Sequence, residues 1–478
     1  MKEKLQGITV KKSEDFSEWY TQVVAKAELA DYTMVSGCMV FRPYSYAIWE
    51  ILQHSFDTKF KKTGVVNVYF PIFIPESLLT KEEEHVAGFS PEVAWVTHAG
   101  NEKLTERLAI RPTSETIMYD SYSKWVRSWR DLPILYNQWC SVVRWEFKYP
   151  KPFLRTREFL WQEGHTAHET LEQADEQTLM ILEIYRKTVE ELLAIPLMSG
   201  RKSEKEKFAG ALYTTTIEAI MPDGKCLQMG TSHNLGQNFA KAFGIKFLGR
   251  DGAEHLVWQT SWGVSTRLIG ALIMVHGDDK GLVLPPNVAP IQVVIVPILF
   301  EDSAKEVLKE CHAIESALKK HHTVKLDDRD SYSPGWKFNE WEMKGVPIRI
   351  EVGPKDIKNE SAVLVRRDTL EKTIVKVSDI KEKVESMLKD IQSSLFDKAK
   401  KHLDHSIQKV HAWEEFKSAI EKKKIAFAPF CGEKQCEEQI REKSGGATTR
   451  LIPFDQDKTH KCFNCGKEAA NTYFGKSY

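Results

Sequence analysis

Four cysteines near the end of the chain constrain its fold more than any other feature of the sequence. Cys431 and Cys436 have four residues between them, Cys462 and Cys465 have two, and 25 residues separate the pairs. Each pair suits a turn that offers two thiolates, and four thiolates complete the tetrahedral shell of one Zn²⁺. The pattern predicts a structural zinc site that contributes to folding, against the alternative of four unrelated thiols.

The length of 478 residues exceeds what one ordinary core needs, and at about 150 residues per domain it suggests roughly three domains. Irregular alternation of strand-like and helix-like runs up to about residue 280 favours an antiparallel sheet with helices. Strands and helices that alternate after Pro285-Pro286 indicate a small α/β domain, and a Lys-rich helical stretch (397–424) leads into the cysteines. We expect an α/β protein with domains at 1–284, 285–396 and 397–478.

The charge balance gives no argument for a nucleic-acid partner, because Lys+Arg and Asp+Glu both total 67. Charges in Met1–Lys12 stand where a signal peptide needs an apolar core. The longest apolar-rich run, Ile291–Phe300, has half of the about 20 residues that a membrane span needs. We therefore expect a cytoplasmic protein without a membrane partner.

A predicted hairpin carries a concentrated set of polar and aromatic side chains. Val142–Phe147 and Arg157–His165 are the expected strands, around a turn with two prolines. Because side chains alternate along a strand, two sets should each share a face: Arg144 and Glu146, and then Arg157, Phe159, Trp161, Glu163 and His165. The alternative is a half-buried sheet with surface ion pairs and core aromatics.

Five shorter segments accompany this hairpin. Arg111-Pro-Thr-Ser-Glu115 opens an expected helix that runs to about Val126, and Thr113 could simply be its N-cap. A small-residue approach to Arg267, followed by the apolar run Leu268–Val275, suits a phosphate at a helix start. Nearer the N-terminus we expect helices at Ser13–Ala30, capped by Ser13, and at Tyr44–Lys61, then a strand at Val65–Phe70 that stops at Pro71.

In combination these segments resemble the three signature motifs of class II aminoacyl-tRNA synthetases. The first is the helix and strand ending at Pro71, the second is the hairpin from Arg144 to Glu163, and the third is Gly263–Arg267 with its helix. The Arg111–Glu115 loop and the string Trp161-x-Glu163-x-His165 narrow the resemblance to prolyl-tRNA synthetases. It covers the whole chain and is similar to the archaeal and eukaryotic type, which has a C-terminal zinc domain and also occurs in some bacteria.

The resemblance implies an enzyme that activates L-proline with ATP and transfers it from prolyl-adenylate to the 3′-terminal ribose of its tRNA. Arg144 and Arg267 would be the catalytic residues. The implied proline-binding set is Thr113, Glu115, Arg144, Trp161, Glu163, His165 and His233. The implied ATP-binding set is Arg144, Glu146, Arg155, Thr156, Phe159, Gln228, Thr231, Ser265 and Arg267. For His165 and His233, a purely structural role is the alternative.

The resemblance also implies partners and a quaternary structure. Mg²⁺ would accompany ATP, and the motif ending at Pro71 would lie at a homodimer interface. Arg155 and Arg267 are 112 positions apart, which leaves no room for the inserted editing domain of the usual bacterial type and suggests a separate trans-editing protein. Arg329, Lys337 and Arg349 are weak candidates for reading the anticodon, and the carboxylate of Tyr478 could fold back toward the active site.

Two other interpretations compete. A synthetase for another amino acid would differ in its pocket or architecture: a threonyl enzyme needs a catalytic zinc, and a seryl enzyme a long N-terminal helical hairpin. The second rival is an inactive paralogue that binds RNA or protein. The intact set of Arg144, Glu146, Arg155 and Arg267 argues against it, since a drifted paralogue has no reason to keep these charges.

Overall fold

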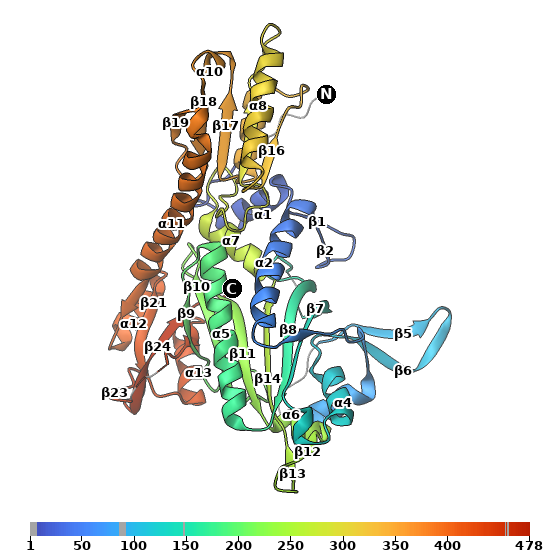
Figure 1. Cartoon of the computed structure of the whole chain (residues 1–478). Coiled ribbons are helices and arrows are strands. Elements are labelled where there is room, and N and C mark those ends of the chain that lie inside the picture. Colours follow the sequence, from blue (N-terminus) through green and yellow to red (C-terminus); the bar gives the residue numbers. More distant parts are fainter. Residues whose placement is uncertain (1–6, 86–91, 147–148, 455, 457) are drawn as a thin grey trace.

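The computed structural model of the chain describes residues 7–85, 92–146, 149–454, 456 and 458–478 (Figure 1). Its largest sheet has seven strands, which pair antiparallel except for the first two. Their order across the sheet is β3 (Val66–Asn67), β7 (Ile134–Val143), β8 (Glu158–His168), β14 (Trp258–Ser265), β11 (Cys226–Gly236), β10 (Tyr213–Ile220) and β9 (Met198–Arg201). The predicted antiparallel sheet with helices is confirmed.

Three helices cover one face of this sheet: α2 (Pro43–Lys61), α5 (Leu171–Leu193) and α7 (Arg267–His276). In Figure 1, α5 runs along the strands. Trp262 belongs to this core, and its indole lies so close to Gly164 on β8 that a Cβ there would come within 2.2 Å of the ring. Only glycine fits at that position, because the facing ring occupies the space of a side chain.

Smaller elements surround the sheet. The β5–β6 hairpin (Trp95–Ala99 and Glu102–Ile110) projects away from the body in Figure 1 and pairs with β4 (Phe73–Pro75). The remaining elements before residue 280 are α1 (Phe16–Lys26), β1 (Ala30–Tyr32), β2 (Met39–Phe41), α3 (Glu76–His85), α4 (Glu115–Trp125), η1 (Trp129–Asp131), α6 (Asn238–Phe243), β12 (Lys246–Leu248) and β13 (Glu254–Leu256).

The second structural unit, which runs from β15 into α11, has the small α/β fold expected from the sequence. Its sheet has the order β16 (Val324–Leu326), β15 (Val293–Pro297), β17 (Ile348–Val352), β18 (Ser361–Arg366) and β19 (Lys372–Lys376), with β15 parallel to both neighbours. Its shorter helices are α8 (Ala304–Leu318), α9 (Pro334–Met343), α10 (Pro354–Lys358) and η2 (Val377–Asp379).

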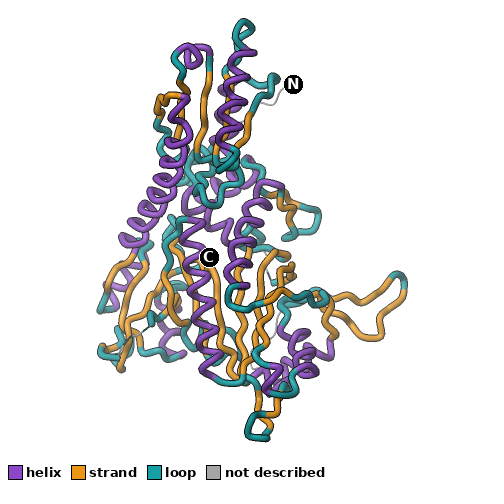
Figure 2. Tube along the Cα trace, in the orientation of Figure 1, coloured by secondary structure: helices purple, strands orange, loops and turns teal. Residues whose placement is uncertain are grey.

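Helix α11 (Ile380–Ser406) leads from the second unit to the third as one continuous element (Figures 1 and 2). It therefore crosses the boundary expected at 396/397, which stays a prediction. The third unit contains β20 (Ile407–Lys409), α12 (Trp413–Glu421), β21 (Ile425–Phe430), α13 (Lys434–Lys443), β22 (Thr448–Leu451), β23 (His460–Lys461) and β24 (Glu468–Gly475). The Lys-rich stretch 397–424, expected to be helical, is formed by the end of α11 and by α12, with β20 between them.

Other expected boundaries need correction. Helix α1 starts at Phe16 because Asp15, not Ser13, caps it by accepting from the backbone amides of Ser17 and Glu18. Strand β7 ends at Val143, so Arg144 and Glu146 lie beyond it rather than on one of its faces. Phe147 lies outside the described residues. The strand expected up to Phe70 is reduced to Val66–Asn67, and Pro71 is an exposed loop residue.

Among the helices that the structure describes, none is long and apolar enough to cross a membrane.

Candidate active site

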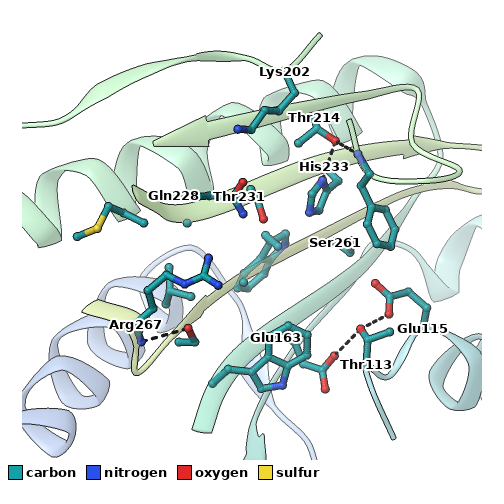
Figure 3. A pocket seen from close by; sticks show the side chains of 18 of the residues that line it. Thr113, Glu115, Glu163, Lys202, Thr214, Gln228, Thr231, His233, Ser261 and Arg267 are labelled. Atoms are coloured by element: carbon teal, nitrogen blue, oxygen red, sulfur yellow. Dashed lines mark hydrogen bonds between the residues drawn. The ribbon is translucent and has the colours of Figure 1, made fainter. Parts of the chain in front are cut away.

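A cavity of about 270 Å³ lies on the seven-stranded sheet, walled by β8, β11, β14 and the start of α4 (Figure 3). Most of the predicted substrate residues line it: Thr113, Glu115, Arg144, Phe159, Trp161, Glu163, His165, Gln228, Thr231, His233, Ser265 and Arg267. Glu146, Arg155 and Thr156 are not part of its wall. The cavity thus unites side chains from separate stretches of the sequence.

Strand β8 supplies the floor because its alternating residues, from Phe159 to His165, point into the cavity. Arg157, expected on the same face, precedes the strand and turns away. Its guanidinium lies 4.3 Å from the Trp145 ring centroid, and Nη1 donates to the carbonyl of Ser36 at 3.0 Å. The prediction for Arg157 was therefore wrong, since it stabilises a neighbouring loop.

Glu163 is buried at the centre of a hydrogen-bond network. Its carboxylate accepts from the Ser114 amide at 3.0 Å, from Gln138 Nε2 at 3.1 Å, and from the Ser114 hydroxyl. His165 Nε2 lies 3.0 Å from Glu163 Oε2, and its Nδ1 lies 3.2 Å from the Tyr119 hydroxyl. These bonds occupy the polar atoms of both residues and fix the floor in one geometry.

Protonation follows from these contacts. Burial alone would raise the pKa of Glu163, but the hydrogen bond and charge of His165, with the Ser114 donor, lower it to about 2. Burial opposes a charge on His165, yet the carboxylates of Glu115 and Glu163 outweigh it and raise the His165 pKa. Both shifts favour the charged form of the group concerned, the Glu163 carboxylate and the His165 imidazolium.

Glu115 is the carboxylate left to face a ligand. It is 3% exposed at the first turn of α4, and Thr113 Oγ1 donates to its Oε2. No further hydrogen bond to its carboxylate is present among the described residues, whereas Glu163 is fully engaged. Helix α4 begins at Glu115, where the positive end of the helix favours a carboxylate. Its N-cap is Ser114 rather than Thr113.

Arg144 and Arg267 bring positive charge to the cavity, and Figure 3 shows Arg267 at the end away from Glu115. Arg144 Nε donates to the Pro112 carbonyl at 3.0 Å, and its guanidinium lies 5.2 Å from the Trp161 centroid and 5.6 Å from that of Phe159. Burial, together with the charges of Arg144 and Arg155, lowers the pKa of Arg267 to about 10. Converging cations that disfavour each other mark a place where an anion is stabilised.

His233 belongs to the rim opposite the floor. Its Nδ1 lies 2.9 Å from Thr214 Oγ1, which also accepts from the Phe208 amide at 2.9 Å (Figure 3). The Phe208 ring lies 4.8 Å from the imidazole. Burial and the charge of His165 lower the pKa of His233 to about 3, so it is neutral at ordinary pH.

Several residues of the wall have no signal in the sequence, among them Lys202, Glu206, Phe208, Thr214 and Ser261. Lys202, Glu206 and Phe208 follow β9 in a segment without helical or strand periodicity. No pattern in the chain marks such a segment, and only its connection to the adjacent strands brings it to the cavity. Thr214 and Ser261 lie on strands, yet nothing distinguishes their hydroxyls in sequence from ordinary strand residues.

The four C-terminal cysteines come together as a candidate metal centre. Their sulfur atoms all lie within 4.8 Å of one another, with Cys436 and Cys462 at 3.8 Å and Cys431 and Cys465 at 3.6 Å. Tetrahedral zinc with bonds of about 2.3 Å places its sulfurs roughly 3.8 Å apart. The geometry fits the zinc prediction, and Asn464 Nδ2 adds a donor to Cys436 Sγ at 3.3 Å.

Other predicted residues lie elsewhere. Tyr478 is absent from the cavity wall, and its hydroxyl donates to Asp223 at 2.7 Å in the turn between β10 and β11. Arg329, Lys337 and Arg349 are held inside the second unit: Arg329 by the carboxylates of Asp327 and Glu340, Lys337 by the Asp327 carbonyl, and Arg349 by the carboxylates of Glu342 and Glu351. These bonds stabilise that unit, and a reading role for the three stays a prediction.

Comparisons with known proteins give consistent results for successive parts of the chain. Residues 95–276 match the family described as tRNA synthetase class II core domain (G, H, P, S and T), residues 292–387 match the anticodon binding domain, and residues 413–478 match the C-terminal domain of prolyl-tRNA synthetase. A proline–tRNA ligase of Alkaliphilus oremlandii is 58% identical over 97% of this chain and 96% of its own length. A proline–tRNA ligase 2 of Bacillus cereus is 56% identical over 100% of both, and the ligase of Natranaerobius thermophilus is 54% identical over 98% and 97%.

Proposed function

The chain belongs to the prolyl-tRNA synthetase family, and from this premise we propose how the residues of the cavity divide the work of the reaction. The enzyme activates L-proline with ATP, releases pyrophosphate, and transfers the prolyl group from prolyl-adenylate to the 3′-terminal ribose of tRNA. In the first step a carboxylate attacks a phosphate, so two anions must be aligned and their charge stabilised.

At the carboxylate end of the cavity, Glu115 binds the secondary ammonium of proline. Support comes from its burial and from the absence, among the described residues, of a cation bound to it. Thr113 orients this carboxylate. Glu163 and His165 act on proline indirectly, since their polar atoms are bonded to each other and to neighbours. Trp161, His233 and Phe208 enclose the ring.

At the guanidinium end, Arg144 bridges the proline carboxylate and the α-phosphate. Its planar fork offers donors to both anions and remains charged. Arg267 and Phe159 enclose the adenine, with Gln228, Thr231 and Ser265 along the nucleotide. Mg²⁺ bound with ATP offsets charge on the leaving pyrophosphate. Glu146, Arg155 and Thr156 lie outside the wall, and for Arg155 the effect of its charge on Arg267 supports a place near the phosphates.

Further features of the enzyme remain proposals of the same kind. Zn²⁺ bound by the four cysteines stabilises the third unit and takes no part in the chemistry, because four thiolates leave it no open position. The motif ending at Pro71 forms a homodimer interface, the enzyme works in the cytoplasm, and a separate protein hydrolyses mischarged alanyl-tRNA.

The division of roles rests on one observation: a buried carboxylate, Glu115, and two half-buried guanidinium groups, Arg144 and Arg267, line one cavity, with Glu115 and Arg267 at different ends of it (Figure 3). Calorimetric titration with ATP tests the nucleotide end. Wild type should bind ATP, and Arg267→Met should weaken binding at least about tenfold, the cost of a lost charged hydrogen bond or stack. Arg250→Ala, an exposed arginine outside the wall, is the matched control. Zinc-loaded protein that binds no ATP would support the inactive paralogue.

A further inference from the structure

The segment between β9 and β10 forms part of the cavity wall and also contacts the third unit, called the C-terminal unit below. Lys202, Glu206 and Phe208 from this segment line the cavity. Arg201, the last residue of β9, forms an isolated bridge with Ile452, which directly follows β22 in the unit that contains the cysteines. A wall of the active site is therefore built against a domain whose sequence is distant from it.

Backbone contacts fix this junction. The Arg201 amide donates to the Ile452 carbonyl at 2.8 Å, and the Ile452 amide donates to the Arg201 carbonyl at 2.7 Å. A Cβ at Gly200 would meet the Ile452 oxygen at 2.3 Å, so this approach requires glycine. Thr449 Oγ1 lies 3.0 Å from Ser203 Oγ, within hydrogen-bond distance. The C-terminal unit is thus joined to the edge strand of the catalytic sheet by an isolated bridge, while the two sheets remain separate.

Three charged side chains are buried at the same junction. Arg450 holds Glu218 of β10 with two bonds, Nε to Oε2 at 2.8 Å and Nη2 to Oε1 at 2.9 Å. Lys202 Nζ donates to the same Glu218 carboxylate and to the Arg450 carbonyl at 3.0 Å. The side chains of Lys202, Glu218 and Arg450 are 4%, 0% and 6% exposed.

The charges of this trio do not cancel. Within the trio one carboxylate faces two cations, which is a formal net charge of about +1. Glu206, which also lines the cavity, acts on Arg450 with a further negative charge. Figure 3 shows the Lys202 side chain reaching toward the end of the cavity with Gln228, Thr231 and Arg267, away from Glu115. Without Arg450, Lys202 and Glu218 would form a neutral pair, and a buried neutral pair offers little attraction to a polyanion.

We propose that Arg450 is a positioning residue for ATP: by pairing with Glu218 it leaves the ammonium of Lys202 as net positive charge toward the nucleotide. The inference rests on the assignment of this cavity to ATP and proline. It also gives the C-terminal unit a role in substrate binding beyond its own stability. Arg450 itself is absent from the cavity wall and acts through the two residues it touches.

Proline-dependent ATP–pyrophosphate exchange, with ATP and proline varied separately, tests the proposal. Arg450→Met should raise the KM for ATP about tenfold, the effect of one lost charged interaction, and change the KM for proline far less. The double variant Glu218→Gln/Arg450→Met removes the neutralising carboxylate as well, so the KM for ATP should return most of the way to wild type. A purely structural ion pair predicts no such rescue.

Two further variants distinguish an effect on folding from an effect of the charge. Lys467→Ala breaks an exposed ion pair with Glu433 within the same C-terminal unit and should leave both KM values unchanged. If Arg450→Met does not fold, Lys202→Met decides the question, because it leaves the Arg450–Glu218 pair balanced and should also raise the KM for ATP. An unchanged KM for ATP in a folded Arg450→Met or Lys202→Met enzyme, or a double variant as impaired as the single one, would overturn the inference. Absence of exchange in wild type would instead refute the proposed function.

Discussion

His165 Nε2 lies 3.0 Å from Glu163 Oε2, and the two side chains are 1% and 2% exposed. A buried pair of this kind couples the stability of the cavity floor to pH. The pKa of His165 is raised in the folded state by the Glu115 and Glu163 carboxylates, against the effect of burial. The stability that protonated His165 contributes to the folded protein is therefore fully present below the unfolded pKa near 6.5. It is lost as the pH rises through the pKa of His165 in the folded protein.

The first prediction follows from this sign. His165→Gln should lower the melting temperature more at pH 6 than at pH 9, relative to wild type. His168 is the control, because burial lowers its pKa to about 4 and its linkage has the opposite sign. The decrease in melting temperature caused by His168→Gln should be greater at pH 9 than at pH 6. If both variants show the same trend, the charged His165–Glu163 pair is refuted.

Glu115→Gln should raise the KM for proline roughly ten- to a hundredfold, since a hydrogen bond to a charged group contributes about 1.5–3 kcal/mol. The KM for ATP should change little, because Glu115 stands at the other end of the cavity. Asp120→Asn removes an exposed ion pair with Lys124 on the same helix and serves as the matched control. Steady-state kinetics of ATP–pyrophosphate exchange measure both KM values for wild type, Glu115→Gln and Asp120→Asn. An unchanged KM for proline would assign the ammonium to another group.

Each chain should bind one zinc ion, and Cys436→Ser should abolish this binding. Because structural zinc contributes its binding energy to folding, this variant should lower the melting temperature and loosen residues 413–478 toward proteolysis. Cys38→Ser lies outside the cysteine cluster and should keep the metal. Metal content by mass spectrometry decides: full zinc in Cys436→Ser, or none in wild type, contradicts the assignment.

The chain should not hydrolyse alanyl-tRNA. The stretch between Arg155 and Arg267 is occupied by elements of the catalytic fold, from β8 to β14, with no inserted domain among its described residues. A pocket for proline discriminates against alanine only by lost contacts, about 1–3 kcal/mol per methylene-sized difference. Preformed alanyl-tRNA should therefore decay with the enzyme at the rate seen in buffer, and faster decay would reveal an editing site.

Sequence reasoning succeeded where a local pattern determines the position of a side chain. Alternation along β8 placed Trp161, Glu163 and His165 on one face, and paired cysteine spacing predicted the sulfur cluster. It failed where a strand ended early, as at Arg144, because strand termini depend on tertiary contacts rather than on propensity.

Long-range contacts account for the other misses. Lys202 and Phe208 belong to an irregular segment, and the partner of Glu218 is Arg450, 232 residues away. The helix α11 continues past residue 396 because its apolar residues pack on different units in turn. Leu388 and Ile391 pack in the core of the second unit, and Leu403 packs in a cluster shared by the catalytic sheet and the third unit. None of these pairings has a signature that a single sequence displays.

The most direct test of the account is ATP–pyrophosphate exchange with each of the twenty amino acids, using wild type and Arg144→Ala. Wild type should show strong exchange with proline alone, and Arg144→Ala should lose it, because that guanidinium aligns the two anions of the first step. Exchange with a different amino acid would contradict the assignment of the cavity around Trp161 and Glu115. No exchange with any of them, from folded and zinc-loaded protein, would contradict the account as a whole.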